Sequence, residues 1–88
     1  MRGIQREKVF EADAAEIIGS VKRADEFLEA TEDALARNPL IGTRLGLSDV
    51  WFLPVVASAT VDPVVLYYTF NDQYVYFLYL QRTQLPEL

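Results

Sequence analysis

Apolar and polar positions follow different periods in the two halves of the chain. Between residues 10 and 35, apolar or small residues recur three or four positions apart. This spacing is typical of an amphipathic helix. Gly19 suits the end of one helix and Ser20 the N-cap of the next, which favours two helices, over residues 11–18 and 21–37. One continuous helix is the alternative, because the periodicity survives across the glycine.

The second half is patterned for strands. Asn38 precedes a proline and so avoids the helical conformation, which ends the second helix. A loop punctuated by glycines follows over residues 40–46. Three runs rich in Val, Tyr and Phe then predict strands, which we place at residues 50–56, 64–70 and 74–81.

The last two strands form a hairpin if Asn71-Asp72 is a turn. Residues 4–10 are a weaker strand candidate, because they are strongly charged. The pattern therefore predicts an α+β domain in the order β-α-α-β-β-β, with a helical hairpin packed on a small antiparallel sheet.

Both faces of the predicted sheet are apolar, whereas most small antiparallel sheets bury only one face. Alternation puts one set of side chains on the first face: Val65, Tyr67, Tyr74, Tyr76, Leu78 and Leu80. It puts a second set on the other: Val64, Leu66, Tyr68, Phe70, Val75, Phe77 and Tyr79. Two short helices cover one face only, so the other needs a partner, a second copy or a terminal segment. The alternative is a sheet enclosed between the helices and the N-terminal residues.

Composition narrows the chemistry. The 88 residues suit a single domain, and the absence of Cys and His excludes disulfides, thiolate zinc sites and imidazole catalysis. We expect no cofactor and no metal. The net charge of −5 argues against binding of nucleic acid through its phosphates. The acidic residues of the helices are read as a solvated surface, with a basic partner as the alternative.

The longest apolar run, residues 74–80, is far shorter than the roughly 20 residues that span a membrane. No apolar segment follows the charged N-terminus, so a secretory signal is not expected and the predicted location is the cytoplasm. We expect residues 1–9 and 83–88 to be mobile or to be ordered by a partner.

An ordered series of short motifs resembles the RelE/ParE superfamily, whose members include plasmid stabilisation proteins. The motifs are Leu35 to Gly42 (LARNPLIG) at the end of the second helix, Phe10 with Ala14, Val50 to Leu53 (VWFL), Val64 to Tyr67 (VVLY) and Leu80 to Arg82 (LQR). The resemblance covers residues 10–83. It implies the toxin of a toxin–antitoxin pair. RelE-like members cleave mRNA on the ribosome, whereas ParE-like members inhibit DNA gyrase.

The residues that the resemblance assigns to RNA cleavage are mostly replaced. Val64 stands where the family has a strand arginine and Gln81 where it has a histidine, and residues 83–88 lack the terminal tyrosine. Only Arg44 and Arg82 remain as candidate phosphate contacts, and an exposed strand end is an equal explanation for Arg82. We therefore expect no catalytic residues.

The sequence thus predicts a toxin-like component of a type II toxin–antitoxin system that acts through protein binding, either ParE-like or a catalytically degenerate RelE-like member. Its expected partner is an antitoxin or a second copy of itself, with gyrase or the ribosome as target. The predicted binding face consists of Val64, Leu66, Tyr68, Phe77 and Tyr79. One alternative is a divergent RelE-like mRNA endoribonuclease that uses Arg44, Arg82 and a tyrosine. The other is a structural homodimer without toxicity.

Overall fold

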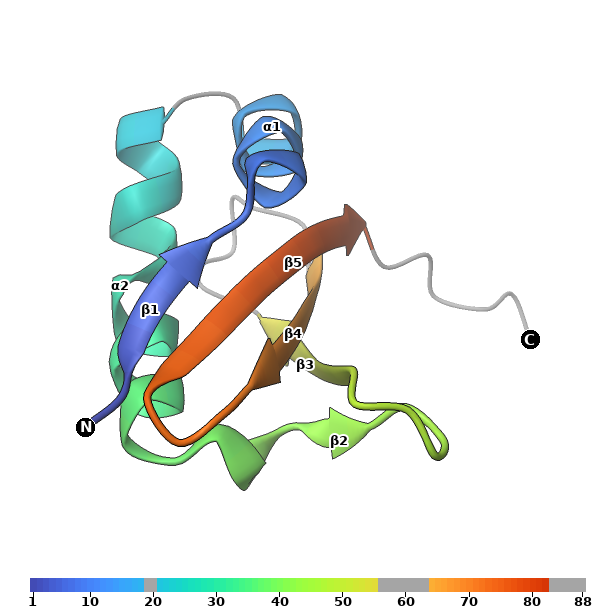
Figure 1. Ribbon diagram of the computed structural model, residues 1–88. Helices are drawn as coiled ribbons and strands as arrows, with labels where there is room; N and C mark the ends of the chain where they lie inside the picture. The colour runs from blue at the N-terminus through green and yellow to red at the C-terminus, as the bar shows by residue number, and fades with distance from the viewer. Residues whose placement is uncertain (19–20, 56–63, 83–88) are drawn as a thin grey trace.

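The computed structural model describes residues 1–18, 21–55 and 64–82, which form a five-stranded sheet and two helices (Figure 1). This is the α+β class predicted from the sequence. In chain order the elements are β1 (Gly3–Arg6), α1 (Lys8–Ile18), α2 (Val21–Arg37), the 3-10 helix η1 (Pro39–Ile41), β2 (Thr43–Arg44), β3 (Trp51–Val55), β4 (Val64–Phe70) and β5 (Tyr74–Arg82). Residues 83–88 lie outside the described ranges.

The helices are two separate elements, as predicted. Figure 1 shows α1 nearly end-on and α2 side-on, so they do not continue one another. The helix α1 begins at Lys8, earlier than predicted, and the predicted break at Gly19 and Ser20 lies outside the described residues. Asn38 follows α2 with an extended backbone, and its side chain accepts a hydrogen bond from the Leu40 amide at 3.2 Å, which caps η1.

The strand order is β1-β5-β4-β3-β2, so β4 is central and β1 and β2 are the edges. The antiparallel meander of β3, β4 and β5 is the one that the sequence predicted. In contrast, β1 runs parallel to β5, which corrects the prediction of an antiparallel sheet. A parallel neighbour needs a long connection, and here both helices lie between the two strands in the chain. The short strand β2 forms within the segment predicted as a loop.

The core lies between the helices and one face of the sheet. Its side chains are almost completely buried: Phe10, Ala14, Ile18, Leu28, Leu35, Val55, Val64, Leu66, Tyr68, Val75, Phe77 and Leu80. Phe10 of α1 packs edge-to-face on Phe77 of β5, with 5.2 Å between the ring centroids. Burial of one phenylalanine side chain contributes about 2 to 3 kcal/mol, so this contact holds α1 on the sheet.

A β-bulge in β5 decides which of its side chains reach the core. Tyr67 pairs with Tyr79 whereas the next residue, Tyr68, pairs with Phe77, so Leu78 is an extra residue in β5. An extra residue moves every later side chain to the opposite face. The side chain of Leu80 therefore lies in the core, and that of Tyr79 lies on the other face. Both positions are the reverse of the prediction.

Candidate functional site

The sheet face turned away from the core, here called the outer face, carries no charged side chain at any described strand position. Residues paired across strands share a face, so the register defines its members. They come from all five strands: Gly3, Gln5, Thr43, Phe52, Pro54, Val65, Tyr67, Thr69, Tyr74, Tyr76, Tyr79 and Gln81. In a chain of which 24% of the residues are charged, this absence distinguishes the outer face from the rest of the surface.

Aromatic rings form a row across the outer face. Tyr67 and Tyr79 stack with 4.4 Å between ring centroids and 19° between ring planes. Phe52 lies on the other side of Tyr67, at 6.3 Å. Tyr74 and Tyr76 form a further pair on β5, at 6.1 Å. All five rings keep part of their surface exposed. Protein interfaces are enriched in such rings, because tyrosine combines a large apolar area with a polar tip.

The structure places four of the five predicted binding residues in the core. Val64, Leu66, Tyr68 and Phe77 have no exposed surface, because the helices cover the face that was predicted to be open. The prediction of an open face is wrong for these four. Only Tyr79 lies on the outer face, and it does so because of the bulge.

Arg44, a predicted phosphate contact, supports the turn between β2 and β3. Its guanidinium donates hydrogen bonds to the backbone carbonyls of Ser48, at 2.8 Å, and Leu47, at 3.2 Å. These bonds occupy two of the five N–H donors of the guanidinium and give Arg44 a structural role in the turn. Gly46 in the same turn has a φ of +59°, and the side chain of Leu47 is 95% exposed.

Arg82, the other predicted phosphate contact, is an exposed residue at the end of β5. It pairs with Val64, whereas Arg44 lies in the row of Trp51, Tyr68 and Phe77. Three strand spacings and four residue rows separate the two arginines, a distance on the order of 20 Å. The structure therefore does not bring them together around one phosphate.

Tyr68 connects the central strand to the segment that follows α2. Its buried hydroxyl donates a hydrogen bond to the carbonyl oxygen of Pro39 at 2.6 Å and accepts one from the Gly42 amide at 3.1 Å. Burial raises the pKa of Tyr68, and the bond from Gly42 offsets part of this rise. Tyr68 is therefore a structural residue.

We expect the raised pKa of Tyr68 to make the fold sensitive to alkaline pH. In the unfolded chain the phenol has a pKa of about 10, so the unfolded chain loses this proton at a lower pH than the folded chain does. The contribution of the neutral Tyr68 phenol to stability is therefore complete below about pH 10 and is lost as the pH rises towards the folded pKa. Between about pH 8 and 11, the free energy of unfolding in urea should fall more for wild type than for Tyr68→Phe. Tyr76→Phe is the matched control and should behave as wild type. Equal losses in wild type and Tyr68→Phe would contradict the assignment.

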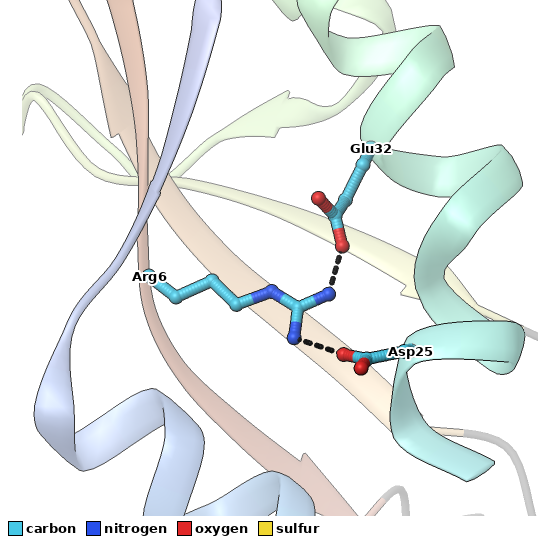
Figure 2. Close-up of polar contacts among 3 residues, drawn as sticks. All are labelled: Arg6, Asp25 and Glu32. Atoms are coloured by element: carbon cyan, nitrogen blue, oxygen red, sulfur yellow. Dashed lines mark hydrogen bonds and ion pairs between the residues drawn. The ribbon is translucent and has the colours of Figure 1, made fainter. Parts of the chain in front are cut away.

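Arg6 joins the edge strand β1 to α2 (Figure 2). Its guanidinium donates hydrogen bonds to Asp25, at 2.6 Å, and to Glu32. The same group lies 6.0 Å from the ring centroid of Phe10. Burial alone would lower the pKa of Arg6, but the bonds to both carboxylates and their charges raise it. Arg6 thus fixes α2 against the sheet.

We expect Arg6→Met to lower the free energy of unfolding by about 1 kcal/mol, because the ion pairs are only partly shielded from water. Arg37→Met is the matched control, since Arg37 pairs with Asp33 at 3.3 Å between side chains that are more than half exposed. Its loss should be close to zero. Urea denaturation at low salt and at about 1 M NaCl measures the free energy of unfolding of both variants. At the higher salt concentration, the stability difference between wild type and Arg6→Met should become smaller. An equal loss in both variants would assign Arg6 no special role.

A groove of about 490 Å³ lies between β1 and α2. Ile4 and Ala36 contribute apolar surface to it, and its charged lining residues are Arg2, Arg6, Asp25, Glu26, Glu29, Glu32 and Asp33. Arg6 spans the groove towards two of these carboxylates, as Figure 2 shows. The ion pairs of Arg6 thus connect the two walls of the groove.

The carboxylates of α2 do not converge on a cation. Within residues 1–18, 21–55 and 64–82, no three acidic side chains are grouped as metal ligands. In the same part of the chain, no helix is both long and apolar enough to cross a membrane. Compared with known proteins, the chain matches no protein-family model, no curated protein and no solved structure.

Proposed function

We propose that this chain is the toxin-like component of a type II toxin–antitoxin pair and that it acts by binding protein. The RelE/ParE resemblance of residues 10–83 supports the toxin-like class. The observation that supports protein binding is the outer face, which combines a row of aromatic rings with the absence of charge. Interface centres have this composition.

Cleavage of RNA has less support. That reaction requires proton transfer and positive charge close to the reacting phosphate. Arg44 is engaged by turn carbonyls, and the register puts Arg82 roughly 20 Å away from it. Val64, at the position of the family's strand arginine, is fully buried and apolar. The proposed action is therefore contact with a protein target, as in ParE-like members.

Inducible expression in a bacterial host tests the proposal. We expect wild type to arrest growth without new 5′ ends in cellular mRNA. Tyr76→Lys, which places a charge on the outer face, should abolish the arrest. Arg82→Ala, a change at a strand end, should leave it intact. Folding of each purified variant is confirmed by circular dichroism.

Two results would overturn this proposal. Normal growth with abundant, folded wild-type protein would remove the toxin-like role. Growth arrest with mRNA cleavage, both lost in Arg82→Ala, would instead establish the ribonuclease alternative.

A further inference from the structure

We infer that the outer face binds a second copy of this chain, so that two sheets pack face to face in a symmetric dimer. The inference rests on the proposed function in one respect, the protein-binding role of the outer face, and it names the partner. Gyrase, the ribosome or an antitoxin would then compete with the second copy for the same surface.

The distribution of charge allows two copies to approach through this face. Acidic residues gather in the helix layer, on the opposite side of the sheet, among them Glu11, Glu16, Asp25, Glu26, Glu29 and Asp33. With about 10 Å between successive layers, the two helix layers of a dimer are roughly 30 Å apart. The Debye length at physiological salt is about 8 Å. Repulsion between the two acidic layers is therefore screened, although each chain carries a net charge of −5.

The absence of charge also makes the outer face compatible with a copy of itself. A partner selected by charge is recognised through opposite charges across the contact. The outer face offers none at its described strand positions, from Gly3 and Gln5 on β1 to Thr43 on β2. In a twofold contact the same patch meets itself, which excludes charged residues from the centre unless each finds an opposite charge. An uncharged face satisfies this condition.

The aromatic row supplies the contact surface. Tyr67 lies on the central strand β4 and is flanked by Tyr79 of β5 and Phe52 of β3. Because these rings already pack on one another, they lose little freedom when a second sheet covers them. Two twisted sheets stack about 10 Å apart with their strands near 30° to one another, which lets rings from the two copies interdigitate.

The expected affinity is modest. A standard interface uses about 20 to 30 residues from each partner, and the outer face offers fewer. We therefore expect a dissociation constant on the order of 10 µM, which corresponds to an exchange between monomer and dimer at working concentrations.

Sedimentation equilibrium of the purified chain between about 1 and 500 µM measures this exchange. We expect wild type to move from monomer to dimer across the range. Tyr67→Lys should weaken association by at least a hundredfold, because it places like charges at the centre of the contact. Ala30→Lys makes the same charge change on an exposed position of α2 and should leave association unchanged. A wild type that stays monomeric throughout, or a Tyr67→Lys variant that associates as wild type does, overturns the inference.

A dilution series followed by two-dimensional NMR keeps the inference testable if Tyr67→Lys does not fold. On dilution of wild type, amide signals of β3, β4 and β5 should shift while those of α1 and α2 stay constant. Shifts confined to the helices would overturn the inference. Self-association and growth arrest are separate measurements. A monomeric protein that arrests growth would contradict only the dimer, and a dimer that does not arrest growth would contradict only the proposed function.

Discussion

Replacement of Gly42 by alanine is expected to lower the free energy of unfolding by about 3 kcal/mol, the sum of overpacking and of two strained hydrogen bonds. A Cβ atom at this position would lie 2.7 Å from the carbonyl oxygen of Phe52 and closer still to the hydroxyl of Tyr68. Neither atom moves freely, because one is backbone of β3 and the other is held by Pro39 and Gly42. A domain of this size is stabilised by roughly 5 to 10 kcal/mol in total, so the loss is large.

The cause of this loss is lack of space, and Gly46→Ala is the matched control. Gly42 has a φ of −79°, which any residue adopts, whereas Gly46 has a φ of +59° and no atom near its missing side chain. Gly46→Ala should therefore cost only about 1 kcal/mol, through backbone strain. Urea denaturation of both variants measures the difference. A smaller loss for Gly42→Ala than for Gly46→Ala would contradict the close packing of η1 on the sheet.

The double variant Gly42→Ala/Tyr68→Phe separates the two contacts. Removal of the Tyr68 hydroxyl relieves one of them and leaves the contact with the Phe52 carbonyl. We therefore expect the double variant to lose less stability than the two single variants together, by about 1 kcal/mol, as is usual for residues in direct contact. Additive losses would show that the hydroxyl is not the obstacle.

The elements with a clear period could be predicted from the sequence, and the pairing of β1 could not. Helices and meander strands carry their own signals, as in the apolar spacing from Phe10 to Leu35 and the aromatic run of β5. The strand β1 has only four residues, and its one charged residue, Arg6, forms ion pairs with two carboxylates of α2. Those two ion pairs depend on tertiary contacts between residues far apart in the chain, which no local pattern contains.

The site could be predicted only in part. The sequence showed that both faces of the sheet are apolar, and the structure shows which face the helices cover. One signal in the sequence separates the faces only in part, since Tyr68 is a core tyrosine and Val65 is an apolar residue of the outer face. Val64, Leu66 and Val75 are purely apolar, whereas Tyr67 and Tyr76 carry polar tips that suit a face reached by water. Val64 was predicted on the open face because it stands where the family has a strand arginine, and its complete burial shows that this prediction is wrong.

Because of the bulge in β5, the neighbouring residues Tyr79 and Leu80 lie in opposite environments, and their replacement should change stability by very different amounts. Phe77→Ala and Leu80→Ala should each lower the free energy of unfolding by about 3 to 5 kcal/mol, since both side chains are buried and leave cavities. Tyr79→Ala lies between them in the sequence and removes a large ring. It should cost only about 1 kcal/mol, because the ring lies on the partly exposed outer face, where it stacks on Tyr67.

Urea denaturation at about 1 µM, well below the expected dissociation constant of the dimer, compares these variants as monomers. A strand without a bulge would place Phe77 and Tyr79 on one face and Leu80 on the other. In that case Tyr79→Ala would cost as much as Phe77→Ala, and Leu80→Ala would cost little. Whether Tyr79→Ala or Leu80→Ala loses more free energy of unfolding therefore decides whether Leu78 forms a bulge in β5 in solution. The same extra residue brings Tyr79 into the aromatic row, so this order also tests the surface on which the proposed binding depends.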